Sequence, residues 1–206
     1  MRDAAPQTIY LADYTPYGFI IDALHFDLDP RKTRVKSRIS FRPNPDASDK
    51  TFFLHGENLS LVSAMIDGTP VSPEVTPQGL TCDVPDAPFV WEAEVEIDPM
   101  GNTALEGLYM SNGMYCTQCE AEGFRKITYY PDRPDVMAVF TVTINGPHPV
   151  LLSNGNPVSS GKDTAEWHDP WPKPAYLFAL VAGDLVAHPG SFTTKSGRKV
   201  DLNLYV

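Results

Sequence analysis

The sequence lacks the long apolar runs and the abundant cysteines that mark two large classes of protein. No apolar stretch approaches the roughly 18 residues of a membrane-spanning helix, and the first residues, MRDAAPQTIYLADY, contain no apolar core of a secretion signal. The 206 residues include only three cysteines, Cys82, Cys116 and Cys119, which is an odd number. We therefore expect free thiols, no disulfide framework and a cytoplasmic protein.

Positive charge is scarce as well. The chain has 16 Lys and Arg residues against 26 Asp and Glu residues, which gives a net charge of −10, and its basic residues form no stripe. A nucleic-acid partner requires cations that displace counterions from phosphates, and an anionic membrane surface has a similar requirement. We therefore expect neither nucleic acid nor a membrane as a partner.

Short catalytic motifs are also missing. None of the five histidines has another histidine four residues away, so the chain contains no HExxH zinc motif, and it has no GxSxG elbow and no glycine-rich phosphate loop. The stretch CTQC at residues 116–119 has the CxxC spacing of zinc and redox sites. A structural zinc needs four ligands, and no second paired motif exists. We interpret these cysteines as ordinary thiols on a strand or loop, with zinc or redox chemistry as the less favoured alternative.

The most frequent pattern in the sequence is an alternation of apolar and polar residues with a period of two. Residues 89–98 alternate between apolar and acidic side chains, residues 34–42 between apolar and basic ones, and residues 136–145 between apolar and uncharged polar ones. Each pattern predicts a strand with one buried face and one wet face. The basic strand and the acidic strand could pair across a sheet, although the sequence leaves their register open.

The remaining pattern predicts a protein built almost entirely of strands. The 20 prolines favour short strands and loops over helices, and only residues 120–129 suggest a helix, a short one. Turns are expected at Asp67-Gly68 and Ser196-Gly197. Further strands are expected at residues 19–28, 50–54, 59–66, 150–153 and 175–183, the last apolar on both faces and therefore interior. We predict one all-β unit over residues 1–206, a multi-stranded sandwich or a saddle of packed sheets.

The last residues predict that the chain was cut from a longer protein. Residues 200–206 keep the alternation of a strand up to the end of the sequence, whereas a natural domain usually ends in polar surface residues.

Two groups of residues are candidates for a function. Glu120 and Glu122 are two acids at i and i+2, which is weak evidence in a chain with 26 acidic residues. The stretch EWHDPWPKP predicts an aromatic, proline-rich loop, in which packing at a domain edge is favoured over stacking on a sugar. A stand-alone β-sandwich module that binds protein, or carbohydrate through Trp167, Trp171 and Tyr176, is therefore an alternative function.

Four stretches resemble the N-terminal domain of the bacterial aminopeptidase N family, which consists of zinc metalloaminopeptidases of the gluzincin class. They are YTPYGFIIDALHFDLDP, TQCEAEGFRKITYYPDRPDVMAVF, VLLSNGNPV and WPKPAYLFALVAGDL, in the order of the family, and the resemblance runs from about residue 8 to the end. It implies a β domain that precedes a zinc catalytic domain, in an enzyme that removes N-terminal residues from peptides.

The resemblance also implies roles for two residues. In the family the glutamate of the TQCE motif anchors the free α-amino group of the substrate, and the glutamine helps line the site for its first residue; these positions are Glu120 and Gln118. The family's zinc ligands, general base and transition-state tyrosine lie beyond this domain, and the GAMEN and HExxH motifs are absent here. We expect zinc in the parent enzyme only, with no metal ligand, catalytic residue or activity in these 206 residues.

The expected partners are peptides with a free N-terminus and the downstream catalytic domain. A noncatalytic scaffold that has lost the zinc domain is a further alternative.

Overall fold

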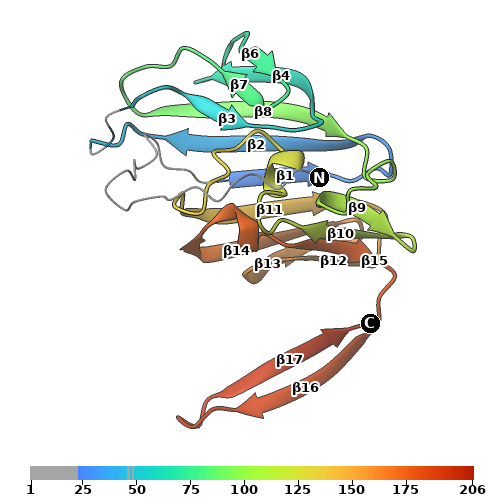
Figure 1. The fold of residues 1–206 in the computed structure, drawn as a ribbon. Helices are drawn as coiled ribbons and strands as arrows, with labels where there is room; N and C mark the ends of the chain where they lie inside the picture. The colour runs from blue at the N-terminus through green and yellow to red at the C-terminus, as the bar shows by residue number, and fades with distance from the viewer. Residues whose placement is uncertain (1–22, 46, 48) are drawn as a thin grey trace, which may run out of the picture.

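The computed structural model describes residues 23–45, 47 and 49–206, and these residues form four sheets (Figure 1). The largest sheet has eight strands, in the order β13 (Asn156–Ser160), β14 (Thr164–Lys173), β11 (Ala138–Asn145), β1 (Ala23–Asp27), β2 (Thr33–Phe41), β8 (Phe89–Ile97), β4 (Ser60–Ile66) and β5 (Thr69–Pro70). Among the described strands of this sheet, β1 and β11 alone pair in parallel. The predicted all-β fold is confirmed.

Three smaller sheets accompany the large one. One contains β12 (Val150–Ser153), β15 (Leu180–Gly183), β10 (Met114–Gln118) and β9 (Gly107–Ser111), and another contains β3 (Phe53–His55), β7 (Gly79–Thr81) and β6 (Glu74–Thr76). The third is the hairpin of β16 (Ala187–Thr193) and β17 (Lys199–Tyr205), which extends away from the other strands in Figure 1. No helix within the described ranges is long and apolar enough to cross a membrane.

The basic strand and the acidic strand pair as predicted. They are β2 and β8, which run antiparallel with Arg34 opposite Glu96 and Arg38 opposite Glu92. The Arg34 guanidinium lies 2.8 Å from Glu94 and 2.9 Å from Glu96. Opposite charges on neighbouring strands thus meet on the wet face, while the alternating apolar residues turn to the other face.

The inner face of the large sheet packs against two smaller sheets and the segment between β10 and β11. The large sheet contributes Ile39, Trp91 and Phe140, and the segment contributes Phe124 and Tyr130. The Phe124 ring centroid lies 4.9 Å from that of Tyr130 and 6.0 Å from that of Phe140. The rings meet edge to face, a favourable geometry for aromatic pairs. This packing fixes the segment that carries the candidate site against the sheet.

Residues 175–183 do not form the single strand that was predicted. They form a 3₁₀ turn, η3 (Ala175–Leu177), followed by β15. The cause is Asn154, whose side chain accepts a hydrogen bond from the Ala179 N–H at 2.6 Å and donates one to the Leu177 carbonyl at 3.1 Å. Backbone groups that a sheet would have paired are satisfied by this amide instead.

The proline-rich stretch EWHDPWPKP was predicted as a loop, and this prediction is wrong. All but its last residue, Pro174, lies in β14, which pairs with β11 up to Asp169 and again at Lys173. On the other side of β14 the pairing with β13 ends at His168. Pro170 and Pro172 therefore lie where β13 no longer pairs and where the register with β11 shifts between Asp169 and Lys173, and sheets tolerate proline at such edges and bulges.

The other local predictions are confirmed in part. Of the short helix suggested at residues 120–129, only η2 (Phe124–Lys126) is helical, and it is a single 3₁₀ turn. Both central residues of the Asp67-Gly68 turn have positive φ, 49° and 75°, as a tight hairpin turn requires. Strands are present at β3, β4 and β12 near the predicted positions. Of the strand predicted at residues 19–28, residues 19–22 lie outside the described residues, and β1 lies within the remainder.

Candidate functional site

A hairpin and a tight turn position Gln118 and Glu120. The hairpin of β9 and β10 has Asn112 and Gly113 at its tip, both with positive φ, and Gln118 is the last residue of β10. The chain then forms a turn over residues 119–123, closed by a hydrogen bond from the Gly123 N–H to the Cys119 carbonyl at 2.8 Å. The Gln118 side-chain amide donates to the Glu120 carbonyl at 3.2 Å. The turn therefore brings both predicted residues together, with the Glu120 side chain exposed to solvent.

Glycine allows this turn to lie directly on the hairpin. A Cβ atom at Gly123 would lie 2.3 Å from the Gln118 carbonyl oxygen and 2.9 Å from the Gly107 nitrogen. Gly107 itself has φ of +73°, a conformation that other residues adopt only under strain. Hence residues larger than glycine at position 123 would push the Glu120 turn away from β9 and β10.

Beneath the turn, Arg125 and Asp132 form a buried ion pair. The Arg125 Nε lies 3.1 Å from Asp132 Oδ2, and its Nη2 donates to the Asp132 carbonyl at 3.0 Å. The Arg125 side chain is 11% exposed and that of Asp132 is 3% exposed. Burial raises the pKa of the Asp132 carboxyl above its ordinary value, and the hydrogen bonds from Arg125 oppose that rise.

Arg125 also forms ion pairs with two other acids. Its Nη2 lies 3.2 Å from the Glu122 carboxylate in the turn, and its Nη1 lies 3.8 Å from Glu57. The next residue, Lys126, pairs with Glu106 and Glu57, neither of which belongs to the turn. Sequence reasoning assigned no role to Arg125 or Asp132, because nothing in their spacing shows that they meet under the turn.

His55 joins this network through the backbone of Asp132. Its Nδ1 accepts a hydrogen bond from the Asp132 N–H at 3.2 Å, and its own backbone pairs with Tyr130. An acceptor at Nδ1 places the ring proton on Nε2, so the imidazole is neutral. Burial and, second to it, the positive charge of Arg125 lower the pKa of His55.

The cysteines near the turn are poor candidates for redox or metal chemistry. All three are free, and Cys119 is buried. Burial, with a smaller contribution from the Asp132 charge, raises the pKa of Cys119 to about 12, and burial raises the pKa of Cys116 as well. A raised pKa keeps a thiol protonated, whereas the thiolate is the nucleophile and metal ligand. The described residues do not fit a zinc ion, since they contain no group of three or more His, Cys, Asp or Glu side chains placed to hold a metal.

The three aromatic residues proposed for sugar binding are used differently from one another. Trp167 donates its indole N–H to the Leu151 carbonyl at 3.0 Å and lines a hollow of about 270 Å³. Neither Trp171, which is 76% exposed, nor Tyr176 lines that hollow. The three rings therefore do not line one common hollow on which a sugar could stack, as the carbohydrate alternative requires.

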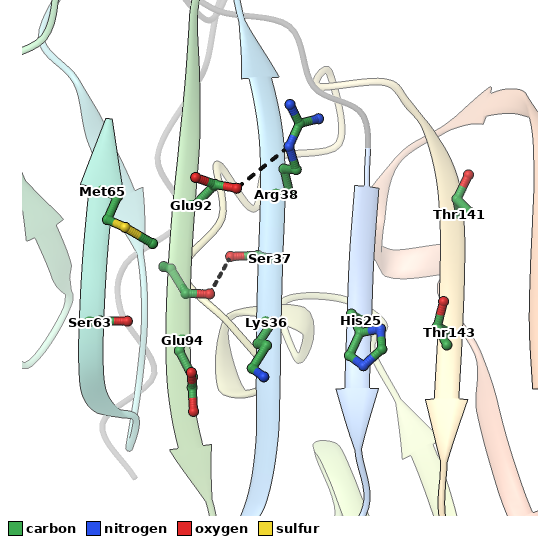
Figure 2. Close-up of a pocket in the computed structure, with 11 residues that line it drawn as sticks. His25, Lys36, Ser37, Arg38, Ser63, Met65, Glu92, Glu94, Thr141 and Thr143 are labelled. Carbon is green, nitrogen blue, oxygen red and sulfur yellow. Dashed lines mark hydrogen bonds and ion pairs between the residues drawn. The ribbon is translucent and has the colours of Figure 1, made fainter. Parts of the chain in front are cut away.

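A second hollow, of about 300 Å³, lies over the wet face of the large sheet (Figure 2). Its charged side chains face one another across β2 and β8, where Arg38 lies 3.6 Å from Glu92. Lys36 lies 3.8 Å from Asp27, on the neighbouring strand β1. Lys36, Arg38, Glu92 and Glu94 each have a partner on the same sheet, and Glu120 and Gln118 do not line this hollow.

Comparison with known proteins identifies close relatives of the whole chain. The model of the Peptidase M1 N-terminal domain matches residues 13–177. Aminopeptidase N of Caulobacter vibrioides is 52% identical over 100% of this chain and 25% of its own length, and aminopeptidase N of Escherichia coli is 48% identical over 98% of this chain and 24% of its own. The chain thus spans about a quarter of the length of these relatives.

Solved structures show the same arrangement of strands. Legionella pneumophila aminopeptidase A, in complex with aspartic acid, superposes with a TM-score of 0.86 at 33% identity, over 95% of this chain and 25% of that one. An M1 zinc metallopeptidase from Deinococcus radiodurans superposes with a TM-score of 0.73 at 16% identity, over 93% of this chain and 48% of that one. The second similarity is one of fold alone.

Proposed function

The chain belongs to the peptidase M1 family, whose N-terminal domain it forms, and from this we propose that it supplies one wall of the substrate site of a zinc aminopeptidase. Such an enzyme removes residues from the free N-terminus of peptides. The proposal is supported by relatives named aminopeptidase N that match this chain from end to end. It is supported further by the turn that presents Glu120 beside Gln118.

Glu120 is proposed to bind the α-amino group of the substrate. A peptide α-amine has a pKa of about 8 and is largely cationic at neutral pH, so a carboxylate forms a charge-assisted hydrogen bond to it. An acetylated or internal amide carries no charge and would leave that carboxylate without its partner. A mismatch of this kind costs about 2–5 kcal/mol. A single acid at this place would therefore favour cleavage at the N-terminus.

Gln118 is proposed to line the site for the first residue of the substrate. Its side-chain amide already donates to the Glu120 carbonyl, which leaves its side-chain oxygen as an acceptor. Because this contact ties Gln118 to the turn, the two residues would move together when a substrate binds. Neither residue is proposed to take part in bond breaking.

The zinc ion and the groups that act on the peptide bond are proposed to belong to another part of the parent enzyme. The described residues do not fit a metal, as stated above, and the relatives are about four times as long as this chain. We propose that a downstream catalytic domain supplies these groups and that the 206 residues alone have no peptidase activity.

The terminal hairpin offers an apolar face for that downstream domain. Residues that pair across β16 and β17 share a face, which places Phe192, Leu202 and Leu204 on one side of the hairpin. All three are exposed, Leu204 to 65%. We propose that the catalytic domain covers this face.

The test is to sequence the gene beyond the codon for Val206 and to assay the complete polypeptide beside residues 1–206. We expect GAMEN and HExxH to follow in frame, and release of N-terminal residues that a zinc chelator abolishes in the complete protein only. A stop codon directly after Val206 would refute the proposal and favour the stand-alone binding module. Chelator-sensitive turnover by residues 1–206 would refute the division of roles.

A further inference from the structure

We propose that Arg125 is a positioning residue that fixes the turn carrying Glu120, with Glu122 as its contact on the turn. This inference rests on the proposed role of Glu120 in binding the substrate amine. It assigns Arg125 no contact with the substrate and no part in the chemistry.

Arg125 connects the turn to two other segments of the chain. Toward the turn, its Nη2 lies 3.2 Å from Glu122, two residues beyond Glu120. Toward the segment before β11, its backbone N–H and its Nε both donate to Asp132. Toward β3, its backbone carbonyl accepts a hydrogen bond from the Glu57 N–H at 3.0 Å. A single residue thus fixes the turn relative to both neighbours.

The turn needs such an anchor because its own contacts are few. Its hydrogen bonds are those from the Gly123 N–H to Cys119, from the Lys126 N–H to Gly123 and from the Gln118 amide, and all of them lie at its ends or on its backbone, with Cys119 buried below. Glu120 and Glu122 point their side chains to solvent, and Glu122 is 69% exposed. An exposed ion pair contributes little when both partners are mobile. Here one partner, Arg125, is already immobilised by Asp132, so the entropy cost of the second contact is smaller.

The shape of the guanidinium matters as much as its charge. Arg125 uses Nε and Nη2 on Asp132, and Nη2 also faces Glu122. A planar fork of donors can hold partners in several fixed directions, whereas a lysine ammonium is a point charge on a flexible stem. Arg125→Lys therefore keeps the charge but loses the geometry. Effects on recognition follow because a displacement of about 1 Å in a binding group can cost about 100-fold in rate.

The test uses the complete aminopeptidase and an aminoacyl anilide substrate with a free amine. We expect Arg125→Lys to lower kcat/KM by about tenfold or more, mainly through a higher KM. The matched control is Arg34→Lys. It replaces a guanidinium that pairs with Glu94 and Glu96 on the solvent-facing side of the large sheet, away from the turn. We expect the control to stay within about twofold of the wild type. Wild-type kinetics in Arg125→Lys would overturn the inference.

A double-mutant cycle separates positioning from general damage. If Arg125 acts through Glu120, Arg125→Lys will have less than about a twofold further effect in a Glu120→Gln background. If the losses in kcat/KM of the two single variants multiply in the double variant, the inference is overturned, because Arg125 then acts independently of Glu120. If Glu120→Gln alone has wild-type kinetics, the proposed function of Glu120 fails instead, so the two failures are distinguishable.

A second variant covers the case in which Arg125→Lys does not fold. Glu122→Gln removes only the contact to the turn and leaves the pair of Arg125 with Asp132 in place. We expect it to raise KM by about two- to fivefold, the range of an ion pair of up to about 1 kcal/mol, with an unchanged melting temperature. We also expect faster amide hydrogen exchange at residues 119–123 in this variant. Unchanged KM together with unchanged exchange would overturn the inference.

Discussion

The backbone N–H and the side-chain Nε of Arg125 donate to the same oxygen of Asp132, Oδ2, each at 3.1 Å. The two residues are seven apart in the chain, and the buried Tyr129 and Tyr130 lie between them. Because both bonds end on one atom, Asp132 fixes the backbone and the side chain of Arg125 at once. The consequence is a rigid base beneath the turn that presents Glu120.

Glu120→Gln should weaken turnover by the complete enzyme. The amide keeps the shape of the side chain but loses the charge that pairs with a cationic amine. With a cost of about 2–5 kcal/mol, kcat/KM should fall by about 30-fold or more. Steady-state kinetics with a free-amine peptide measure this. Glu74→Gln, the same substitution at an exposed acid on β6 outside the turn, is the control and should cost much less. Unchanged kinetics in Glu120→Gln would remove Glu120 from the substrate site.

Asp132→Ala should destabilise the isolated 206-residue chain strongly. It leaves the Arg125 guanidinium buried without its main partner, and breaking a buried pair in this way costs about 3–5 kcal/mol. Urea denaturation followed by tryptophan fluorescence measures the change in the free energy of unfolding. Asp86→Ala is the control, because its pair with Lys50 is exposed and should contribute less than about 1 kcal/mol. Equal losses in both variants would contradict the structural role of the buried pair.

His55 should make the fold less stable in mild acid. Its pKa is lowered in the folded protein, so between the folded value and the unfolded value of about 6.5 the unfolded chain binds more protons. The free energy of unfolding should therefore fall as the pH drops below about 6.5 and level off below the folded pKa. Urea titrations across this range measure it.

His55→Asn is the variant for that experiment, since its side-chain oxygen can accept the Asp132 N–H in place of Nδ1. We expect its stability to depend less on pH in this window than that of the wild type. His188→Asn, on the exposed strand β16, is the control and should keep the wild-type slope. A wild-type slope in His55→Asn would mean that another group causes the acid sensitivity.

Cys119 should resist alkylation in the folded protein. With a pKa of about 12, its thiolate amounts to roughly one molecule in 10,000 at pH 8, and the thiolate is the reactive form. Iodoacetamide treatment followed by peptide mass spectrometry should modify the half-buried Cys82 and Cys116 before Cys119. All three should react in urea. Early modification of Cys119 in the native state would contradict its burial.

The alternation of side chains was sufficient to predict the fold class and the pairing of the two charged strands. Val35, Ile39 and Trp91 are buried because each lies on the apolar side of a period-two pattern, and such patterns depend only on neighbours in the sequence. Gln118 and Glu120 were found through a resemblance, which carries the role of a position but not its geometry. The structure adds the turn that brings the two together.

The sequence by itself determined three strands with a buried face, β2, β8 and β11, because side chains alternate along an extended backbone whatever lies around it. Only the tertiary structure decided where that pattern is interrupted. Asn154 binds Leu177 and Ala179, more than 20 residues away, so that the strand predicted at residues 175–183 begins only at Leu180. Arg125 and Asp132 likewise meet only because the segment between them folds onto the sheet. Backbone donors and buried charges take whichever partner the packed chain brings near, and local sequence does not contain that information.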